Sequence, residues 1–247
     1  TGIDNGIASK NYLIVKTEPT SPVVEAFRGL RTALGFTLKS GSHKSILITS
    51  CAPSDGKSFV SSNLAIIMAN NNYNVLLIDC DMRRGKLKKA FKLPKNAEGL
   101  SEVLSSQAEF EDACHAVNVT NLTLIPAGKR PPNPAELLDN QRMLELFAWA
   151  ETKFDLIIID APPILAVTDA LILAKSSGVK LMIIKHMETS AAEASTALKM
   201  LEASGIRMNG AILNSYDQKK SKYGSYSYKY EYNYGSYNYN YSKSEDE

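Results

Sequence analysis

Residues 45–58 read SILITSCAPSDGKS, an apolar run followed by a short polar loop. The continuous apolar run is typical of a strand that is buried on both faces of a parallel sheet. The loop ends in Gly56-Lys57-Ser58, and apolar residues at helical spacing follow it. Backbone amides of such a loop, at a helix N-terminus, can hold phosphate, while Lys57 reaches the outer phosphates and Ser58 holds Mg²⁺. The stretch therefore predicts a P-loop, although Cys51 replaces the usual first glycine; an ordinary strand–helix turn is the alternative.

Two further apolar runs end in carboxylates. VLLID ends at Asp79 and is followed by Cys80-Asp81, while LIIID ends at Asp160. Because parallel strands bring their carboxyl ends to one edge of the sheet, these aspartates are expected beside the loop. Mg²⁺ prefers oxygen ligands and keeps several waters, so one or two carboxylates and a hydroxyl suffice. The second acidic strand also supplies a candidate base; whether Asp79 or Asp81 has that role stays open, and strand-end caps are the alternative.

Apolar runs alternate with helical patterns along the chain. The expected strands are Ser45–Ser50, Asn74–Asp79, Asn121–Pro126, Asp155–Asp160, Val179–Lys185 and Gly210–Asn214. Helices are expected over 21–40, around 60–67, over Ala135–Thr152 with Trp149 in the core, and around 194–201, ending at Gly205. This alternation predicts an α/β fold: a P-loop NTPase-like, doubly wound, mostly parallel sheet flanked by helices, with a disordered C-terminal tail.

The last segment is rich in tyrosine. Nine of the final 25 residues are tyrosines, and the stretch from 223 to 241 has no aliphatic residue with which to build a core. The tyrosines are Tyr223, Tyr226, Tyr228, Tyr230, Tyr232, Tyr234, Tyr237, Tyr239 and Tyr241. Because they follow a candidate nucleotide site, they suggest an enzyme that carries its own phosphate acceptors. We therefore divide the chain into an N-terminal segment (1–20), a folded domain (21–216) and a flexible tail (217–247).

Composition narrows the possible settings of the protein. A net charge of +2 over 247 residues demands no nucleic-acid partner. Three cysteines without a CxxC motif fit a reducing cytosol. No apolar run approaches the roughly 18 residues of a membrane span, and no signal peptide is recognisable. Because the sequence begins with Thr1, we expect it to be a piece of a longer chain.

Five motifs resemble those of the bacterial tyrosine kinases of capsule-regulating systems, over roughly residues 20 to 241. SCAPSDGKS, VLLIDCDMRRG and LIIIDAPP are similar to the Walker A, A′ and B motifs of that family. Residues 25–31, EAFRGLR, resemble its ExxRxxR oligomerisation motif, and PAGKRPPNPAELL (126–138) resembles its GxxPPNP segment. The tail resembles its terminal tyrosine cluster.

The resemblance implies a juxtamembrane-like segment over 1–20, a P-loop tyrosine kinase domain over 21–216, and autophosphorylation of the tail in trans between subunits. ATP/ADP and Mg²⁺ are the implied cofactors, and regulation of capsular or exopolysaccharide synthesis and export is the implied role. The implied catalytic residues are Lys57, Asp79, Asp81 and Asp160. The implied nucleotide-binding residues are Asp55, Gly56, Lys57, Ser58, Phe59, Arg83 and Asn214. The implied metal ligands are Ser58, Asp79, Asp81 and Asp160.

The resemblance also implies partners. Glu25, Arg28 and Arg31 are expected to join unphosphorylated subunits into a ring, such as an octamer; a solvated helix face is the alternative. A membrane-anchored activator or fused transmembrane domain, a tyrosine phosphatase, and a place in the cytoplasm at the inner face of the bacterial membrane are implied as well. The basic run Arg83–Lys95 is either a solvated charge run or a patch for an acidic partner.

Two other functions compete with a kinase. One is an ATPase switch like the partitioning and division-site ATPases, whose signature lysine stands five positions before the P-loop lysine. Ala52 occupies that position here, which counts against it. The other is a non-catalytic, ATP-gated assembly module whose tail only binds partners. Asp169, which follows Thr168 at an expected helix start, is interpreted as a first-turn carboxylate favoured by the helix dipole.

Overall fold

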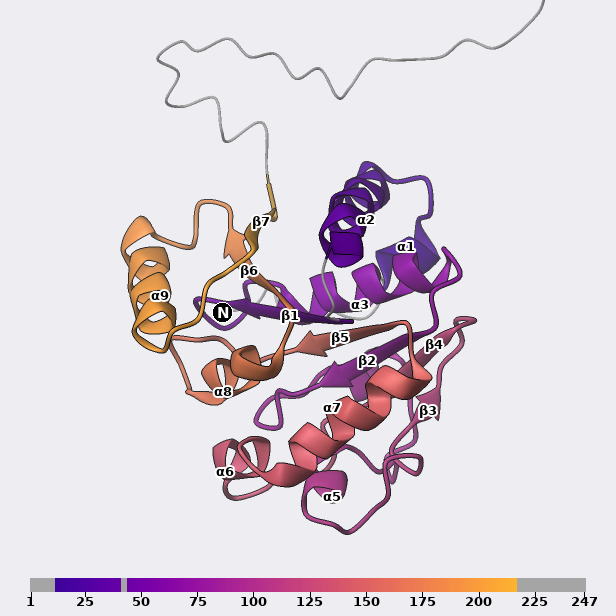
Figure 1. The fold of residues 1–247 in the computed structure, drawn as a ribbon. Helices are drawn as coiled ribbons and strands as arrows, with labels where there is room; N and C mark the ends of the chain where they lie inside the picture. The colour runs from indigo at the N-terminus through magenta and orange to yellow at the C-terminus, as the bar shows by residue number, and fades with distance from the viewer. Residues whose placement is uncertain (1–11, 41–43, 217–247) are drawn as a thin grey trace, which may run out of the picture. The chain divides into compact units, whose positions relative to one another are not determined.

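The computed structural model describes residues 12–40 and 44–216, except the side chains of 39 and 40. They form an α/β domain with a seven-stranded sheet in the order β3-β4-β2-β5-β1-β6-β7 (Figure 1). The strands are β1 (Ser45–Ser50), β2 (Val75–Asp79), β3 (His115–Ala116), β4 (Leu122–Ile125), β5 (Leu156–Asp160), β6 (Val179–Lys185) and β7 (Gly210–Asn214). Every neighbouring pair is parallel except the antiparallel pair β3–β4. The predicted fold class is confirmed; the expected tail lies outside the described residues.

Helices cover both faces of the sheet (Figure 1). One face carries α1 (Ile14–Thr17), α2 (Pro22–Ser40), α3 (Lys57–Ala69) and α4 (Leu87–Ala90). The other carries α5 (Leu100–Leu104), α6 (Pro134–Leu138), α7 (Gln141–Lys153), α8 (Asp169–Ser176) and α9 (Ala191–Ala203). Each face has its own apolar core: Leu47 packs into one, and its neighbours Ile46 and Ile48 into the other. This two-sided burial explains why the inner strands are continuously apolar.

Strand β7 departs from that pattern because it lies at the edge of the sheet. It pairs only with β6 in the described sheet, and its residues alternate between half-buried and exposed. Leu213 is accordingly 52% exposed. The edge position nevertheless places Asn214, the last residue of β7, at the carboxyl ends of the parallel strands.

The prediction of one helix over Ala135–Thr152 is wrong in one respect, because the structure has two helices there. The chain leaves α6 after Leu138, and α7 begins at Gln141 with Asn140 as its cap. The Asn140 side chain accepts the N–H of Met143 at 3.1 Å, so its capping chemistry prevails over the continuous apolar period.

Trp149 also differs from the expectation of a core residue. It is only half-buried and packs at the rim of one apolar core. Its ring nitrogen donates to a carboxylate oxygen of Glu111 at 3.0 Å. The indole thus keeps a polar partner at the surface, as tryptophan commonly does.

The residues before α2 are attached to the folded domain. Helix α1 packs on α3 and α2, and Val15 is buried. The fully buried side chain of Asn63, on α3, holds this segment with both ends of its amide. Its oxygen accepts the N–H of Val15 at 3.1 Å, and its nitrogen donates to the carbonyl of Tyr12 at 2.9 Å. Nothing in the sequence period of residues 12–20 predicts this attachment.

Candidate active site

The loop between β1 and α3 has a backbone suited to hold phosphate. Ser54 and Gly56 have positive φ angles of 68° and 100°. A carboxylate oxygen of Asp55 accepts the N–H of Ala52 at 2.9 Å, which ties the loop to itself. Because α3 begins at Lys57, the free N–H groups of its first turn lie at the end of this loop.

Asn214 braces the loop from the end of β7. Its Nδ2 donates to the carbonyl oxygen of Asp55 at 2.8 Å. A Cβ added to Gly56 would lie 2.0 Å from this same nitrogen, and the φ of Gly56 also disfavours a side chain. Only glycine therefore fits at position 56 while Asn214 keeps its place. Contact between Asn214 and a nucleotide base remains a prediction.

Two buried carboxylates face each other across neighbouring strands. Asp79 and Asp160 are register partners at the ends of β2 and β5, and each residue is 1% exposed. Burial, and next the charge of Asp160, raise the pKa of Asp79 well above its ordinary value. Burial raises the pKa of Asp160 to about 7, although the hydroxyl of Ser58 and the charge of Lys57 lower it. The site thus concentrates negative charge that its own cations offset only in part.

The two carboxylates differ in their partners. Asp79 accepts the N–H groups of Asp81 at 3.2 Å and Leu87 at 3.0 Å. Within residues 12–40 and 44–216, neither oxygen of Asp160 has a hydrogen-bond partner of normal geometry, although the hydroxyls of Ser58 and Ser61 are close enough to lower its pKa. A buried carboxylate without a partner is costly unless a cation binds it. Asp160 and the nearby oxygen groups therefore fit Mg²⁺.

The fit is to an ion that keeps much of its water. No group of three His, Cys, Asp or Glu side chains is arranged to enclose a metal among the described residues. Mg²⁺ does not need such an enclosure, because one or two carboxylates, phosphate oxygens and waters complete its shell.

Lys57 is buried at the centre of the site. It is the first residue of α3, and only 7% of it is exposed. Burial lowers its pKa, whereas the charges of Asp160, Asp81 and Asp55 raise it. The ammonium group therefore lies among carboxylates whose charges favour its protonated form.

Arg83 follows β2 but turns to α8. Its Nε and one terminal nitrogen donate to the two oxygens of Asp169, each at 3.0 Å. Asp169 lies in the first turn of α8, as expected, and its side chain is fully buried. The predicted role of Arg83 in nucleotide binding thus competes with a role in fixing the loop after β2.

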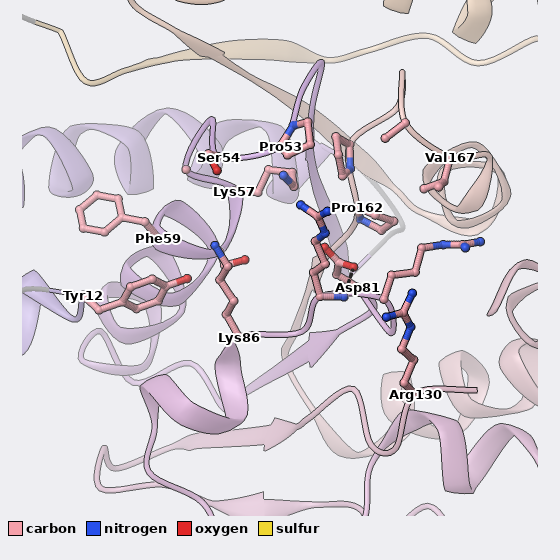
Figure 2. Close-up of a pocket in the computed structure, with 16 residues that line it drawn as sticks. Tyr12, Pro53, Ser54, Lys57, Phe59, Asp81, Lys86, Arg130, Pro162 and Val167 are labelled. Carbon is pink, nitrogen blue, oxygen red and sulfur yellow. Dashed lines mark hydrogen bonds between the residues drawn. The ribbon is translucent and has the colours of Figure 1, made fainter. Parts of the chain in front are cut away.

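A cavity of about 480 Å³ opens between these elements. Figure 2 shows Lys57 and Asp81 directed into it, with Arg130 on the opposite side from Tyr12 and Phe59. Its lining comprises Tyr12, Pro53, Ser54, Gly56, Lys57, Ser58, Phe59, Asp81, Arg83, Arg84, Lys86, Arg130, Pro162, Pro163, Ala166 and Val167. The expected loop and Asp81 therefore share one space, next to the buried Asp79 and Asp160. The volume is ample for a small phosphorylated ligand.

Sequence reasoning missed two residues of this cavity, Tyr12 and Arg130. Tyr12 comes from a segment without a period, and its hydroxyl lies close enough to the Ser58 side chain for that hydroxyl to lower its pKa. Burial, followed by the charge of Asp160, raises the pKa of Tyr12 far above its ordinary value. Arg130 comes from the proline-rich loop before α6. That loop carries the segment that resembles the GxxPPNP motif, but nothing in its composition indicates that it reaches the P-loop.

The basic run 83–95 is not one uniform charged face. Arg83, Arg84 and Lys86 line the cavity. Lys88 instead donates to the carbonyls of Lys95 and Ala97, at 2.6 and 3.0 Å. The first part of the run thus brings positive charge to the cavity, and Lys88 stabilises the turn that follows α4.

The expected oligomerisation residues lie on α2, away from the cavity lining. Arg28 and Glu25 form an ion pair three residues apart. Arg31 donates to the Asn71 side chain, at 3.4 Å, beyond the end of α3. The adjoining stripe of α2, with Val24, Phe27 and Leu34, is buried. This arrangement agrees equally with a subunit contact and with a solvated face.

Comparison with known proteins places the fold in a family. The AAA domain family matches residues 44–208. The solved kinase domain of the Escherichia coli tyrosine kinase ETK superposes with a TM-score of 0.81 at 38% identity, covering 88% of this chain and 84% of that domain. The chain belongs to the bacterial tyrosine-protein kinases. The predicted enzyme class, a tyrosine-protein kinase, is thereby confirmed.

The kinase has longer curated relatives. The tyrosine-protein kinase Wzc of Salmonella typhimurium is 40% identical over 217 residues, which are 88% of this chain but only 30% of Wzc. A relative from Klebsiella pneumoniae is named as a tyrosine-protein kinase in a cps region. This kinase chain therefore spans about a third of the length of such relatives, and within its described part no helix is long and apolar enough to cross a membrane.

The kinase shares its fold with a division-site ATPase as well. The septum site-determining protein MinD of Pyrococcus horikoshii, solved with Mg-ADP, superposes with a TM-score of 0.59 at 23% identity, and the match covers 69% of each chain. At that identity the likeness establishes the fold alone. The kinase domain of ETK matches more of this chain and at a higher identity.

Proposed function

We propose that this domain transfers the γ-phosphoryl group of ATP to tyrosines of its own tail. The observation that carries the proposal is the carboxylate of Asp160, which is buried beside Lys57 and Ser58 at a phosphate-binding loop and has no hydrogen-bond partner of normal geometry within the described residues. A plain phosphate site needs no such carboxylate. A magnesium-nucleotide site does, because the ion must be held against the loop.

The P-loop residues hold the nucleotide in this proposal. The amides at the start of α3 and the ammonium of Lys57 bind the β- and γ-phosphates. Ser58 and Asp160 hold Mg²⁺, together with Asp79 and Asp81 directly or through water. The ion neutralises charge that develops during phosphoryl transfer.

Asp81 is the better candidate for the base. Both oxygens of Asp79 already accept backbone N–H groups, and this carboxylate is buried. Asp81 lines the open cavity. One of its carboxylate oxygens accepts the N–H of Arg84 at 2.9 Å, and that bond leaves the other oxygen free. A tyrosine hydroxyl has a pKa of about 10, so it needs a base within hydrogen-bond reach near neutral pH. Asp81 would receive the proton, and Asp79 would position the loop.

The acceptors are the nine tail tyrosines, phosphorylated between subunits. Their abundance in a segment without a core-forming side chain supports this assignment. Glu25, Arg28 and Arg31 on α2 join the unphosphorylated subunits into a ring. By analogy with a relative named for a cps region, the reaction regulates polysaccharide synthesis and export, with a membrane-anchored partner and a phosphatase that resets the tail.

The decisive experiment is the formation of phosphotyrosine by the purified chain with ATP and Mg²⁺. Mass spectrometry should locate phosphate on residues 223–241, and EDTA should abolish it. ATP hydrolysis without any phosphotyrosine would favour the ATPase switch, whose fold is shared. Nucleotide binding with neither reaction would favour an assembly module.

A further inference from the structure

A second cavity, of about 310 Å³, adjoins the nucleotide cavity, which is the space of about 480 Å³ at the P-loop. Its lining residues come from 101–107, in and after α5, and from 129–137, in the proline-rich loop and α6. We call it the loop cavity. Arg130 lines both cavities and lies on the side of the nucleotide cavity away from Tyr12 (Figure 2). The phosphoryl transfer proposed above gives the loop cavity no role.

The loop that carries Arg130 is fastened to α5 by a buried carboxylate. Glu102 is 6% exposed, and one of its oxygens accepts the N–H of Lys129 at 3.0 Å, while the other accepts that of Gly99 at 2.9 Å. Gly128 has a φ of 82°, and a Cβ added to it would lie 2.1 Å from an oxygen of Glu102. Only glycine permits so close an approach. The backbone that leads into the two basic residues is therefore fixed against α5.

The loop cavity combines positive charge with an apolar wall. Lys129 and Arg130 are its cations, and Pro132 and Leu137 are among its apolar residues. Glu102 is the one acid among the lining residues, and its oxygens already accept the backbone bonds described above. Phosphotyrosine has the matching chemistry, because it carries a dianion for basic side chains on an aromatic ring that apolar side chains can cover. Inorganic phosphate or phosphoserine would use only the charged half of such a site.

The tail has tyrosines at a spacing that suits two adjacent cavities. They stand at every second position from Tyr226 to Tyr234 and again from Tyr237 to Tyr241. In a peptide that binds in extended form, residues two positions apart point to the same side and lie about 7 Å from each other. A phosphotyrosine in one cavity would thus leave further tyrosines on the side that faces the other cavity. Transfer to one tyrosine at a time does not by itself require this period.

We propose that the loop cavity binds a phosphotyrosine in the tail of another chain and thereby positions a nearby tyrosine of that tail for the next transfer. The inference rests on the proposed function, because that reaction makes the phosphotyrosine that the cavity binds. Lys129 and Arg130 hold the phosphate, and the apolar wall holds the ring. The first phosphate on a tail then accelerates the addition of the following ones.

Binding is tested first, without nucleotide. The protein is the nine-phenylalanine variant, which is the full chain with all nine tail tyrosines changed to phenylalanine, so that its own tail does not compete. The probes are labelled peptides of residues 224–236 with phosphotyrosine, phosphoserine or phenylalanine at position 230. In fluorescence anisotropy the phosphotyrosine peptide should bind about tenfold more tightly than the other two, the size of effect that one charge-assisted hydrogen bond contributes. Equal affinity for all three peptides, or for the two phosphorylated ones, would overturn the assignment.

Lys129 is the side chain to change, because it lines the loop cavity but not the nucleotide cavity. Lys129→Gln keeps the backbone N–H that Glu102 accepts, so the loop should keep its structure. This substitution should remove the tenfold preference for phosphotyrosine, and Lys129→Arg should retain it. The matched control is Lys95→Gln, which changes an exposed lysine outside both linings and should leave the preference intact. A preference that survives Lys129→Gln would show that the phosphotyrosine binds elsewhere.

The same peptides with ATP and Mg²⁺ separate this inference from the proposed function. The phosphotyrosine peptide should have a KM about tenfold lower than the phenylalanine peptide at similar kcat, because the added contact lies away from the reacting atoms. Lys129→Gln should erase that difference. If both peptides are phosphorylated with the same KM, the positioning role is overturned and the kinase function stands. If neither peptide gains phosphate while the phosphotyrosine peptide still binds through Lys129, the proposed function fails and the binding site stands.

Discussion

Arg83 and Asp169 form a two-pronged ion pair across 86 residues of sequence, with both N–O distances at 3.0 Å. The pair fixes the loop after β2 to the first turn of α8. One partner is fully buried, while a third of the Arg83 side chain is exposed. Arginine suits this place because its planar fork matches a carboxylate.

Removing Arg83 should destabilise the domain more than it weakens nucleotide binding. Arg83→Met leaves the buried carboxylate of Asp169 uncompensated, which should cost roughly 2 to 3 kcal/mol of unfolding free energy. Urea unfolding measures this cost, with Arg84→Met as the control. The double variant Arg83→Met/Asp169→Asn should recover part of the loss. A double variant less stable than the single one would contradict the pairing argument.

Lys57→Met should abolish catalysis and leave the fold intact. The substitution removes the cation that contacts phosphate, so tail phosphorylation should fall by at least about 10²- to 10³-fold. The denaturation midpoint should not fall, because methionine fills the buried space of the lysine stem. Lys44→Met, just before β1 and at the opposite end of that strand from the P-loop, serves as the control for activity. Near-normal activity of Lys57→Met would remove Lys57 from the site.

Asp160→Asn should stabilise the nucleotide-free domain at pH 8. The folded pKa of Asp160, about 7, exceeds its unfolded value near 4, so folding favours the protonated form. The free-energy cost of ionising Asp160 in the folded protein is therefore absent below about pH 4, grows between pH 4 and 7, and is complete above pH 7. Thermal unfolding of the variant should occur several degrees higher at pH 8, and the difference should shrink toward pH 4.

Two controls sharpen this pH experiment. Asp155→Asn changes a carboxylate at the start of β5, far from the cavity lining, and should show no gain at pH 8. Mg-ADP should raise the melting temperature of wild type but not of Asp160→Asn. A variant that is less stable than wild type at pH 8 would show that Asp160 is not under electrostatic strain.

The α2 surface can be tested through molecular mass. The triple variant Glu25→Ala, Arg28→Ala and Arg31→Ala should shift unphosphorylated protein toward the monomer in light scattering. Because Arg31 also contacts Asn71, Asn71→Ala reports how much of the effect passes through the turn after α3. An unchanged mass for the triple variant would return these side chains to a solvated role.

Tail phosphorylation between subunits predicts the result of mixing two variants. Lys57→Met chains should gain tail phosphate only when mixed with active chains, here the nine-phenylalanine variant. Full modification of nine tyrosines adds roughly −14 to −18 of charge, against a net +2, so phosphorylated chains should dissociate. The rate at which the Lys57→Met chains gain phosphate should rise with the total protein concentration. Absence of phosphate on the Lys57→Met chains would exclude transfer between subunits.

The strands and the positions of Asp79 and Asp160 were predictable because their signals are local. A run such as SILITS is apolar on both faces, and β1 covers the same six residues as expected. Asp79 and Asp160 follow from the rule that parallel strands share their carboxyl ends. The break at Asn140 was missed because a cap depends on a single side chain within an otherwise continuous apolar period.

Tertiary contacts between distant segments were out of reach. No pattern near Tyr12 indicates that it meets Ser58, 46 positions later. The pairing of Arg83 with Asp169 likewise depends on how the first turn of α8 is placed against the loop that follows β2. The two-residue β3 is too short for any periodicity. Charges and polar groups that meet only in the folded state carry no local sequence signal.

The buried side-chain amide of Asn63 couples residues 12–15 mechanically to α3. One side chain on α3 carries both hydrogen bonds that fasten residues 12–15, and α3 begins with Lys57 and Ser58. A pull on the chain ahead of Tyr12 would load those two bonds first. Tension that broke them would withdraw the phenol from the P-loop, so traction on the N-terminal segment would uncover the active site.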